Sequence, residues 1–315
     1  MRKMKNTTHI EGYVYEHKLE KKVTGEKSKA PGTVFITGTV FITGTLSIAT
    51  DEDCTNVVGV HFTYVTEITK NGSSNATFKL LESIIDGKIG NVMADGKEAA
   101  GMVRIDSALD LNEWYDKDSN LVSVKRNEGG FLHQTNTLTD DETQRATFDV
   151  DMVINGCKRL EADDDKNLPE RMIVKGAVFN FRNALMPMDF TVLHPNAMDY
   201  FESLEATTKN PVFTRVKGMQ VSRTVIKKVE ETSAWGEVSI RETKSSSRDF
   251  VINWAQQEPY IWDDESTILA SELGEAMAAR EVYLAEVKQR QDEYQASKNN
   301  AIKPAATAAK STYNF

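Results

Sequence analysis

The stretch HIEGYVY at residues 9–15 begins a series of secondary-structure signals that recurs from FDVDMVI at residues 148–154, with almost no repeated letters. In each copy a polar loop comes next, and then an apolar stretch that contains glycine, VFITG at 34–38 or MIVKG at 172–176. Short runs of alternating and β-branched residues bounded by polar segments are typical of strands. Each copy therefore begins with two predicted strands.

A third apolar stretch follows in each copy, at 57–65 and at 189–193. A short helix introduced by Asn-Ala comes after it, NATFKLLES at 75–83 and NAMDYFES at 196–203. Two more long strands complete each copy. The order strand, strand, strand, helix, strand, strand is that of the OB-fold, a five-stranded Greek-key barrel that binds oligonucleotides or oligosaccharides.

We therefore expect a mainly β protein with two tandem OB-like five-stranded β-barrels, each with one short helix, and a C-terminal α-helix. The expected segments are a first barrel at 8–135, a polar linker at 136–145, a second barrel at 146–256, an acidic segment and amphipathic helix at 257–298, and a flexible tail at 299–315.

Helix-forming residues extend from 266 to 297. Their apolar members recur at spacings of three, four and seven residues, which gives one stripe: Leu273, Met277, Leu284, Val287 and Tyr294. A helix with a single apolar stripe is expected to lie against a barrel or a partner helix.

Composition limits the class of protein. The 315 residues are 40% hydrophobic and 27% charged, with a net charge of −9. That charge argues against coating duplex DNA by bulk positive charge, whereas binding of a single strand needs only a local basic groove with aromatic residues. No run of 18 apolar residues and no signal peptide is present, so we expect no contact with a membrane. The two cysteines, Cys54 and Cys157, lack a CxxC partner, which favours a reduced, cytoplasmic protein, in the host cytoplasm if it is phage-encoded.

The hexapeptide TVFITG occurs twice in succession, at 33–38 and 39–44. An insertion of six residues preserves the alternation of a strand. A slippage duplication explains the repeat, and the alternative is a β-arm that pairs with a neighbouring subunit.

No catalytic motif is present. The five histidines are scattered, and Asp163–Asp165 lacks the glycine and terminal glutamate of a calcium loop. The sequence therefore predicts a protein that is not an enzyme and that needs no cofactor or metal.

Basic residues gather where an OB-fold would hold a nucleic acid. The expected loop between the first two strands, Lys18–Gly32, carries five lysines and two glutamates, and we expect four of the lysines to contact phosphates: Lys21, Lys22, Lys27 and Lys29. The alternative is a loop whose charges only promote solubility and do not bind a ligand. The matching loop of the second barrel carries three aspartates and would repel a nucleic-acid backbone.

The hairpins between the fourth and fifth strands combine aromatic and basic residues, as single-strand binding requires. The first carries Trp114, Tyr115, Lys125 and Arg126; the second carries Trp235 with Arg223, Lys227, Lys228, Arg241, Lys244 and Arg248. Alternatively, the tryptophans close the barrel ends and the charged residues are solvated.

Aromatic residues also occur two apart on predicted strands, where they share a face. Tyr64 is a candidate for stacking against a base, with a core role as the alternative. For Phe179 and Phe181 the core is favoured.

The carboxyl-terminal region adds six acidic residues between Glu258 and Glu275, and the chain ends in Tyr313-Asn314-Phe315. Together with the strand order and the basic-aromatic hairpins, this layout resembles phage-type single-stranded DNA-binding proteins. The resemblance implies sequence-independent binding of single-stranded DNA in replication or recombination, and contacts of the C-terminal region with replication proteins. The sequence does not decide whether the protein forms a homo-oligomer, or whether it binds DNA or RNA. The alternatives are a virion or tail assembly protein, whose domains and helix form subunit contacts, and a carbohydrate-binding module.

Overall fold

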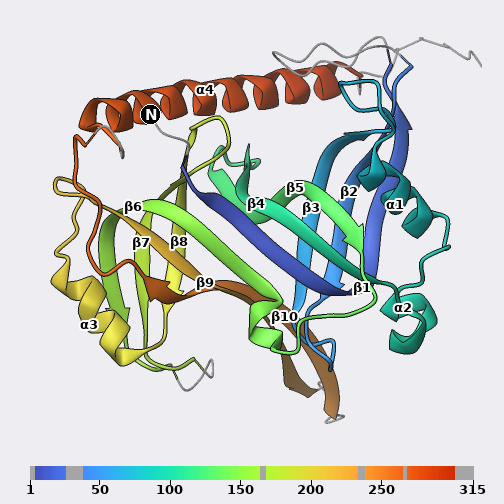
Figure 1. The fold of residues 1–315 in the computed structure, drawn as a ribbon, viewed down its shortest axis with the longest axis horizontal. Helices are drawn as coiled ribbons and strands as arrows, with labels where there is room; N and C mark the ends of the chain where they lie inside the picture. Colours follow the sequence, from blue (N-terminus) through green and yellow to red (C-terminus); the bar gives the residue numbers. More distant parts are fainter. Residues whose placement is uncertain (1–3, 26–37, 164–167, 233–237, 265–267, 302–315) are drawn as a thin grey trace, which may run out of the picture.

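The computed structural model describes residues 4–25, 38–163, 168–232, 238–264 and 268–301. They form a mainly β protein with a long C-terminal helix, as predicted, and the ten strands belong to one sheet (Figure 1). In chain order the elements are β1 (Asn6–Val23), β2 (Val40–Ala49), β3 (Val57–Thr66), α1 (Ala76–Ile85), α2 (Val92–Asp95), the 3₁₀ turn η1 (Lys97–Ala99), β4 (Met102–Tyr115), β5 (Leu121–Gln134), η2 (Glu142–Gln144), β6 (Ala146–Leu160), β7 (Arg171–Phe179), β8 (Leu185–Val192), α3 (Pro195–Ser203), β9 (Val212–Thr232), β10 (Val238–Ala255) and α4 (Ala270–Ala301).

The strand pairings form two closed series. In the first, β1 pairs with β2, β2 with β3, β3 with β5, β5 with β4, and β4 with β1 again. In the second, β6, β7, β8, β10 and β9 pair in the same order and return to β6. Each series contains one short parallel contact, β3–β5 or β8–β10, and β1 pairs antiparallel with β6 between them. We call the two series the first ring (β1–β5) and the second ring (β6–β10).

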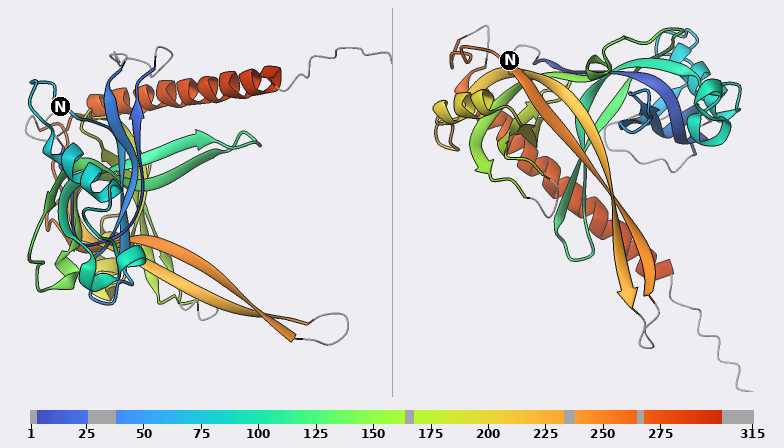
Figure 2. Two further views of the ribbon diagram at one scale, coloured as in Figure 1. Left: turned by 90° about the vertical axis from the view of Figure 1, so that its right-hand side faces the viewer. Right: turned by 90° about the horizontal axis from the view of Figure 1, so that it is seen from below.

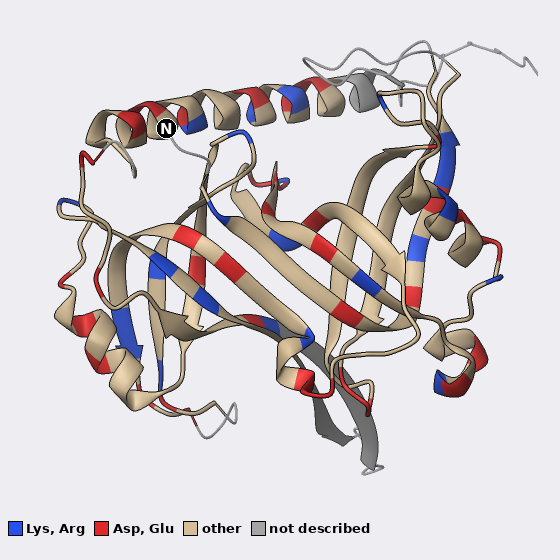
Figure 3. Ribbon diagram, viewed as in Figure 1, with Lys and Arg blue, Asp and Glu red and all other residues tan. Residues whose placement is uncertain are grey.

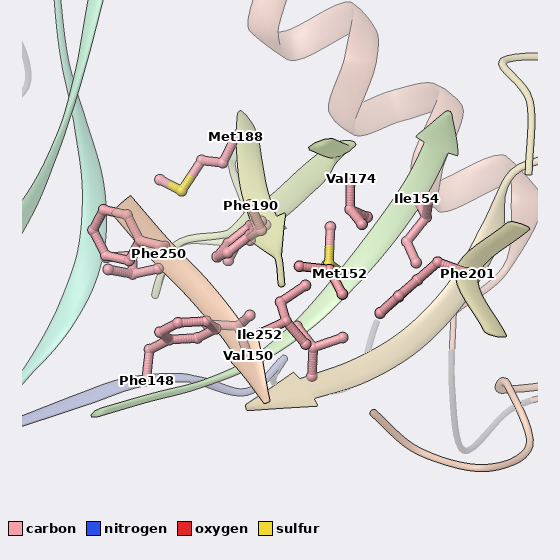
Figure 4. Close-up of a cluster of buried hydrophobic side chains, with 14 of the residues drawn as sticks. Phe148, Val150, Met152, Ile154, Val174, Met188, Phe190, Phe201, Phe250 and Ile252 are labelled. Atoms are coloured by element: carbon pink, nitrogen blue, oxygen red, sulfur yellow. The ribbon is translucent and has the colours of Figure 1, made fainter. Parts of the chain in front are cut away.

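Each ring encloses its own apolar core, because alternating residues of its strands point inward. In the second ring, Phe148 contacts Phe190 and Phe250, with ring centroids 5.3 and 5.9 Å away, and the latter two rings also contact each other (Figure 4). Leu109 and Leu111 of β4 also belong to this core. The first ring's hairpin therefore packs against the second ring, and the two rings share buried surface.

A helix covers part of each ring. Asn75 caps α1 by accepting from the backbone N–H groups of Thr77 and Phe78, as expected of an N-cap asparagine. Phe78 is fully buried against the first ring, and Phe201 of α3 has the same role in the second ring. The predicted helices are present, and the first ring also contains the short α2, which the sequence did not suggest.

The prediction of a loop at Lys18–Gly32 is wrong for the first part of that segment. β1 continues to Val23 because Lys18–Val23 pair with residues 40–45 of β2. The second copy of the hexapeptide supplies these partners, whereas residues 33–37 of the first copy lie outside the described residues. Lys21 and Lys22 are therefore strand residues.

The helix α4 crosses above both rings (Figure 1). The side of the helix that is at least partly buried contains Leu273, Ala276, Arg280, Leu284 and Val287. The predicted stripe is wrong at two positions, since Met277 is 52% and Tyr294 58% exposed. Met277 is four residues after Leu273 and Tyr294 is seven after Val287, so residue spacing alone does not distinguish them from the buried residues.

The segment before α4 is attached to the second ring. Tyr260 and Trp262 pack on Phe213, at 4.7 and 6.0 Å between ring centroids, and the Trp262 indole N–H donates to the Pro211 carbonyl at 3.0 Å. These contacts anchor the start of the helix beside β9.

Candidate nucleic-acid interface

Two antiparallel hairpins project from the same side of the molecule (Figure 2). One consists of β4 and β5 and the other of β9 and β10. β9 pairs with β6 as far as Met219, and from Gln220 to Thr232 it pairs with β10. At roughly 3.3 Å per residue this second hairpin extends about 40 Å beyond the ring. We call residues 221–249 the β9–β10 arm.

Charge is unevenly distributed along the arm. Residues 221–228 and 241–249, the ring-proximal part of the arm, include six basic and two acidic residues, whereas residues 229–240 include three acidic and no basic ones. The backbone register places Lys227 opposite Thr243 and Lys228 opposite Glu242. We call the part next to the ring the basic root; its basic residues are Arg223, Lys227, Lys228, Arg241, Lys244 and Arg248. All six are predicted site residues whose backbone is described, and Arg248 is exposed. Trp235 lies outside the described residues.

Buried amides hold the basic root against the first ring. The side chains of Asn127 on β5 and Gln220 on β9 donate to each other at 2.8 and 3.0 Å. Asn56, just before β3, donates to the Gln220 carbonyl at 3.1 Å and accepts from the Ser222 N–H at 2.6 Å. The hollow at this junction measures only about 20 Å³, so a ligand would lie on the surface beyond it.

The first hairpin has two different faces. Glu113 and Tyr115 face α4, where Glu113 binds Arg280 and the Lys288 ammonium lies 6.0 Å from the Tyr115 ring. Trp114, which alternates with them, is 38% exposed. Trp114 is thus available for stacking, whereas Tyr115 lies under the helix.

Lys125 connects the two rings. Its ammonium donates to the Asp189 carbonyl at 2.6 Å and lies 5.1 Å from the Phe250 ring centroid. Burial lowers the pKa of Lys125, although Asp189 and Asp249 oppose this effect. A phosphate would have to compete with these contacts for the ammonium.

Arg126 lies where three hollows meet, one at the basic root, one under α4 and one beside β3. Its guanidinium pairs with Asp110 at 3.2 Å and Glu128 at 3.0 Å. Burial raises the pKa of Glu128 despite its hydrogen bonds from Thr63 and the nearby Arg126. Burial and the charge of Arg126 lower the pKa of His61. Arg126 is therefore central but already neutralised by carboxylates.

The predicted lysines of the first ring divide into two groups. Lys21 pairs with Glu82 of α1, and Lys22 pairs with Glu20 at 2.6 Å. Lys27 and Lys29 lie outside the described residues. The structure brings Lys125 and Arg126 close to the basic root. Lys21 and Lys22 lie instead on the β1–β2 hairpin.

Tyr64 is half-buried, and its ring lies 4.6 Å from that of Phe41 on β2. It lines the hollow beside β3 together with Arg126. The prediction that Phe179 and Phe181 are core residues is right for Phe179, which is fully buried, and wrong for Phe181, which is 76% exposed. β7 ends at Phe179, and asparagines at 180 and 183, which are common turn residues, could have revealed this.

Acidic and basic residues are interspersed on the strands seen in Figure 3. Several pair across neighbouring strands. Arg215 on β9 donates to Asp149 on β6 at 2.7 Å, and Arg104 on β4 lies 3.1 Å from Glu11 on β1. Because these pairs neutralise each other, the basic root is the better candidate for phosphate contacts.

Among the described residues, no group of three or more His, Cys, Asp or Glu side chains could hold a metal ion. No helix in this part of the chain is long and apolar enough to cross a membrane.

No curated protein matches the sequence. A crystal structure of a deletion mutant of the single-stranded DNA binding protein from Thermus aquaticus is similar with a TM-score of 0.43 and 10% sequence identity, over 84% of this chain and 100% of that chain. The family model YorF matches residues 5–290. The chain therefore belongs to the YorF family.

Proposed function

We propose that this protein binds single-stranded DNA without sequence preference, at the basic root of the β9–β10 arm and on the neighbouring β4–β5 hairpin. The observation that carries the proposal is that equivalent hairpins of the two rings project from one side (Figure 2), with six basic residues on the ring-proximal part of the arm.

We further propose that the two rings are OB-like barrels. Their pairing order supports this, because β1-β2-β3-β5-β4 and its counterpart match the Greek-key order of that fold. The proposed limits are 8–135 and 146–256, with 136–145 as a linker. In an OB-fold the loop between the fourth and fifth strands flanks the ligand, which is where both hairpins lie.

The chemistry of single strands fits such a surface. Lysine and arginine neutralise phosphates and release counterions, so affinity falls as salt rises. Exposed aromatic rings stack on bases for roughly 1–3 kcal/mol each. We assign the first role to the six basic residues of the root and the second to Trp114 and Trp235.

Other candidate residues take smaller roles in the proposal. Lys125, Arg126, Lys21 and Lys22 contact a phosphate only after giving up their present partners. Lys27, Lys29, Tyr64 and Tyr115 stay in the proposal as secondary contacts.

Tryptophan fluorescence tests the function directly. Titration with a thymidine 30-mer is expected to quench the emission at low salt, with an affinity that falls steeply as salt is raised. A signal that stays flat at low salt, together with no shift of the labelled oligonucleotide in a gel, would contradict the proposal.

A further prediction concerns Glu128. Glu128→Gln is expected to tighten DNA binding several-fold, because the change removes a negative charge and releases Arg126 to meet a phosphate. Burial raises the pKa of Glu128, so a neutral amide at this position avoids the cost of burying a charge and should cost little stability. The affinity of the wild type should rise, relative to that of Glu128→Gln, as pH falls through the raised pKa of Glu128.

The matched control for this prediction is Glu170→Gln, which breaks a similar pair, Arg159–Glu170 at 2.7 Å, on the second ring. It should leave the affinity unchanged. Equal affinities for wild type and Glu128→Gln at both neutral and mildly acidic pH would show that Arg126 does not meet the DNA.

The proposed biological setting is DNA replication or recombination, phage replication included, as the resemblance to phage single-stranded DNA-binding proteins implies. The proposed location is the cytoplasm, with replication proteins as partners of the C-terminal region.

One observation favours a different function, that of an assembly protein. Met277, Val282 and Tyr294 of α4 are each more than half exposed, as expected of a helix that contacts another subunit. Light scattering separates the two functions. Stable multimers that do not change on addition of an oligonucleotide would favour assembly.

A further inference from the structure

The turn between β7 and β8 presents Phe181 and Arg182 at the protein surface. The side-chain oxygen of Asn180 accepts from the backbone N–H groups of Arg182 at 2.9 Å and Ala184 at 3.0 Å. Asn183 has a positive φ of 59°, a conformation that asparagine tolerates. Because the turn is held by these hydrogen bonds, the exposure of its side chains is a defined feature of the fold.

The exposure of Phe181 is unusual for so large an apolar side chain. Its ring is 76% exposed, although burial of a phenylalanine normally stabilises a protein. The Arg182 guanidinium carbon lies 5.0 Å from the ring centroid, within the distance of a cation–π contact. An aromatic ring with a stacked arginine is a combination that single-strand binding proteins use for bases and phosphates.

Phe181 and Arg182 line a groove of about 580 Å³, and Tyr64 of the first ring lines it as well. This volume is within the range of small-molecule sites. Phe41 supports Tyr64, with 4.6 Å between the ring centroids. The groove therefore combines aromatic residues from both rings.

The charges that line the groove do not suit a site that binds only phosphates. Arg126 and Arg182 are balanced by Asp110 and Glu128, so the groove offers no excess of positive charge. A flat, uncharged nucleobase suits an aromatic wall of this kind, and Arg182 could meet the phosphate next to it. Arg126 lines both this groove and the hollow at the basic root, which makes the two surfaces continuous.

We propose that this groove is a base-binding subsite, in which one nucleobase of single-stranded DNA stacks on Phe181 opposite Arg182, with Tyr64 on the facing wall. The inference rests on the proposed function and adds a specific position to it. It also assigns the second ring a part in binding that does not depend on the arm.

Affinity measurements on the full-length protein test the subsite. Phe181→Ala should weaken binding of a thymidine 30-mer about tenfold at both low and high salt, because stacking releases no counterions. Arg182→Ala should instead reduce the salt dependence. The control is Phe131→Ala, since Phe131 of β5 is 75% exposed and does not line the groove; we expect its affinity to stay within about twofold of the wild type.

A second readout locates the base. A thymidine 30-mer in which some bases are 5-iodouracil should crosslink, on irradiation, to the peptide that contains Phe181 or to the one that contains Tyr64. Crosslinks elsewhere, with Phe181→Ala binding as tightly as Phe131→Ala, would overturn the subsite while leaving DNA binding at the root intact. Failure of the wild type itself to bind the oligonucleotide would overturn both the subsite and the proposed function.

Discussion

Replacing Lys227 and Lys228 together by glutamate is expected to weaken binding of a thymidine 30-mer about a hundredfold at low salt. Both residues belong to the basic root, eight and nine residues beyond Met219, the last residue of β9 that pairs with β6. Each phosphate contact with single-stranded DNA contributes about 0.7 to the slope of log affinity against log salt. The slope should therefore fall by more than one, and affinities measured by fluorescence anisotropy at several salt concentrations give it directly.

The matched control reverses the charge of two lysines that are far from the root. Lys175 of β7 and Lys209, in the segment between α3 and β9, are both exposed, so Lys175→Glu with Lys209→Glu changes the net charge by the same amount. This control should reduce affinity by no more than about threefold through the overall charge. If the two double variants bind equally well, the arm has no special role and the proposed site is wrong.

Removing Arg280 is expected to destabilise the protein by about 3 kcal/mol. Arg280 forms two hydrogen bonds to Glu113, at 2.6 and 3.1 Å, and a third to the Leu185 carbonyl at 3.2 Å. The Glu113 side chain is 2% exposed. Arg280→Ala would leave this carboxylate buried without its counterion, and breaking a buried pair in this way typically costs 3–5 kcal/mol. Urea unfolding followed by circular dichroism measures the loss.

Arg290→Ala is the control for this prediction, because Arg290 is exposed on the same helix and hydrogen-bonds the carbonyl of Glu286. An exposed substitution of this kind should change stability by no more than about 0.5 kcal/mol. Combining Glu113→Gln with Arg280→Met should recover most of the loss, since no buried charge is then left unpaired. Similar stability of Arg280→Ala and Arg290→Ala would show that the pair does not hold α4 in place.

The elements of the fold could be predicted from the sequence because their signals are local. Alternation along Phe148–Ile154 and the Asn75 cap need only neighbouring residues to be recognised. The end of β1 could not be placed in this way, since Val23 stays in a strand only because Val40 pairs with it.

The candidate site was predictable in composition and not in its contacts. The basic residues of the arm can be read directly from the amino-acid sequence. The partners of Arg126 and Lys125 are not, because Asp110 and Asp189 meet them only after the strands have assembled. The pairing of Asn127 with Gln220 across 93 residues gave no local signal either.

The pairing of β1 with β6 has a consequence for symmetry. These are the first strands of the two rings, and they meet antiparallel, with Thr8 opposite Phe148 and His9 opposite Thr147. Two equivalent strands that pair in this way are related by a local two-fold axis, the same relation that joins the subunits of an isologous dimer. The chain therefore has the architecture of a dimer whose subunits have been fused. Fusion allows the halves to diverge, so that one extends its hairpin into the long β9–β10 arm while the shorter β4–β5 hairpin of the other contacts α4.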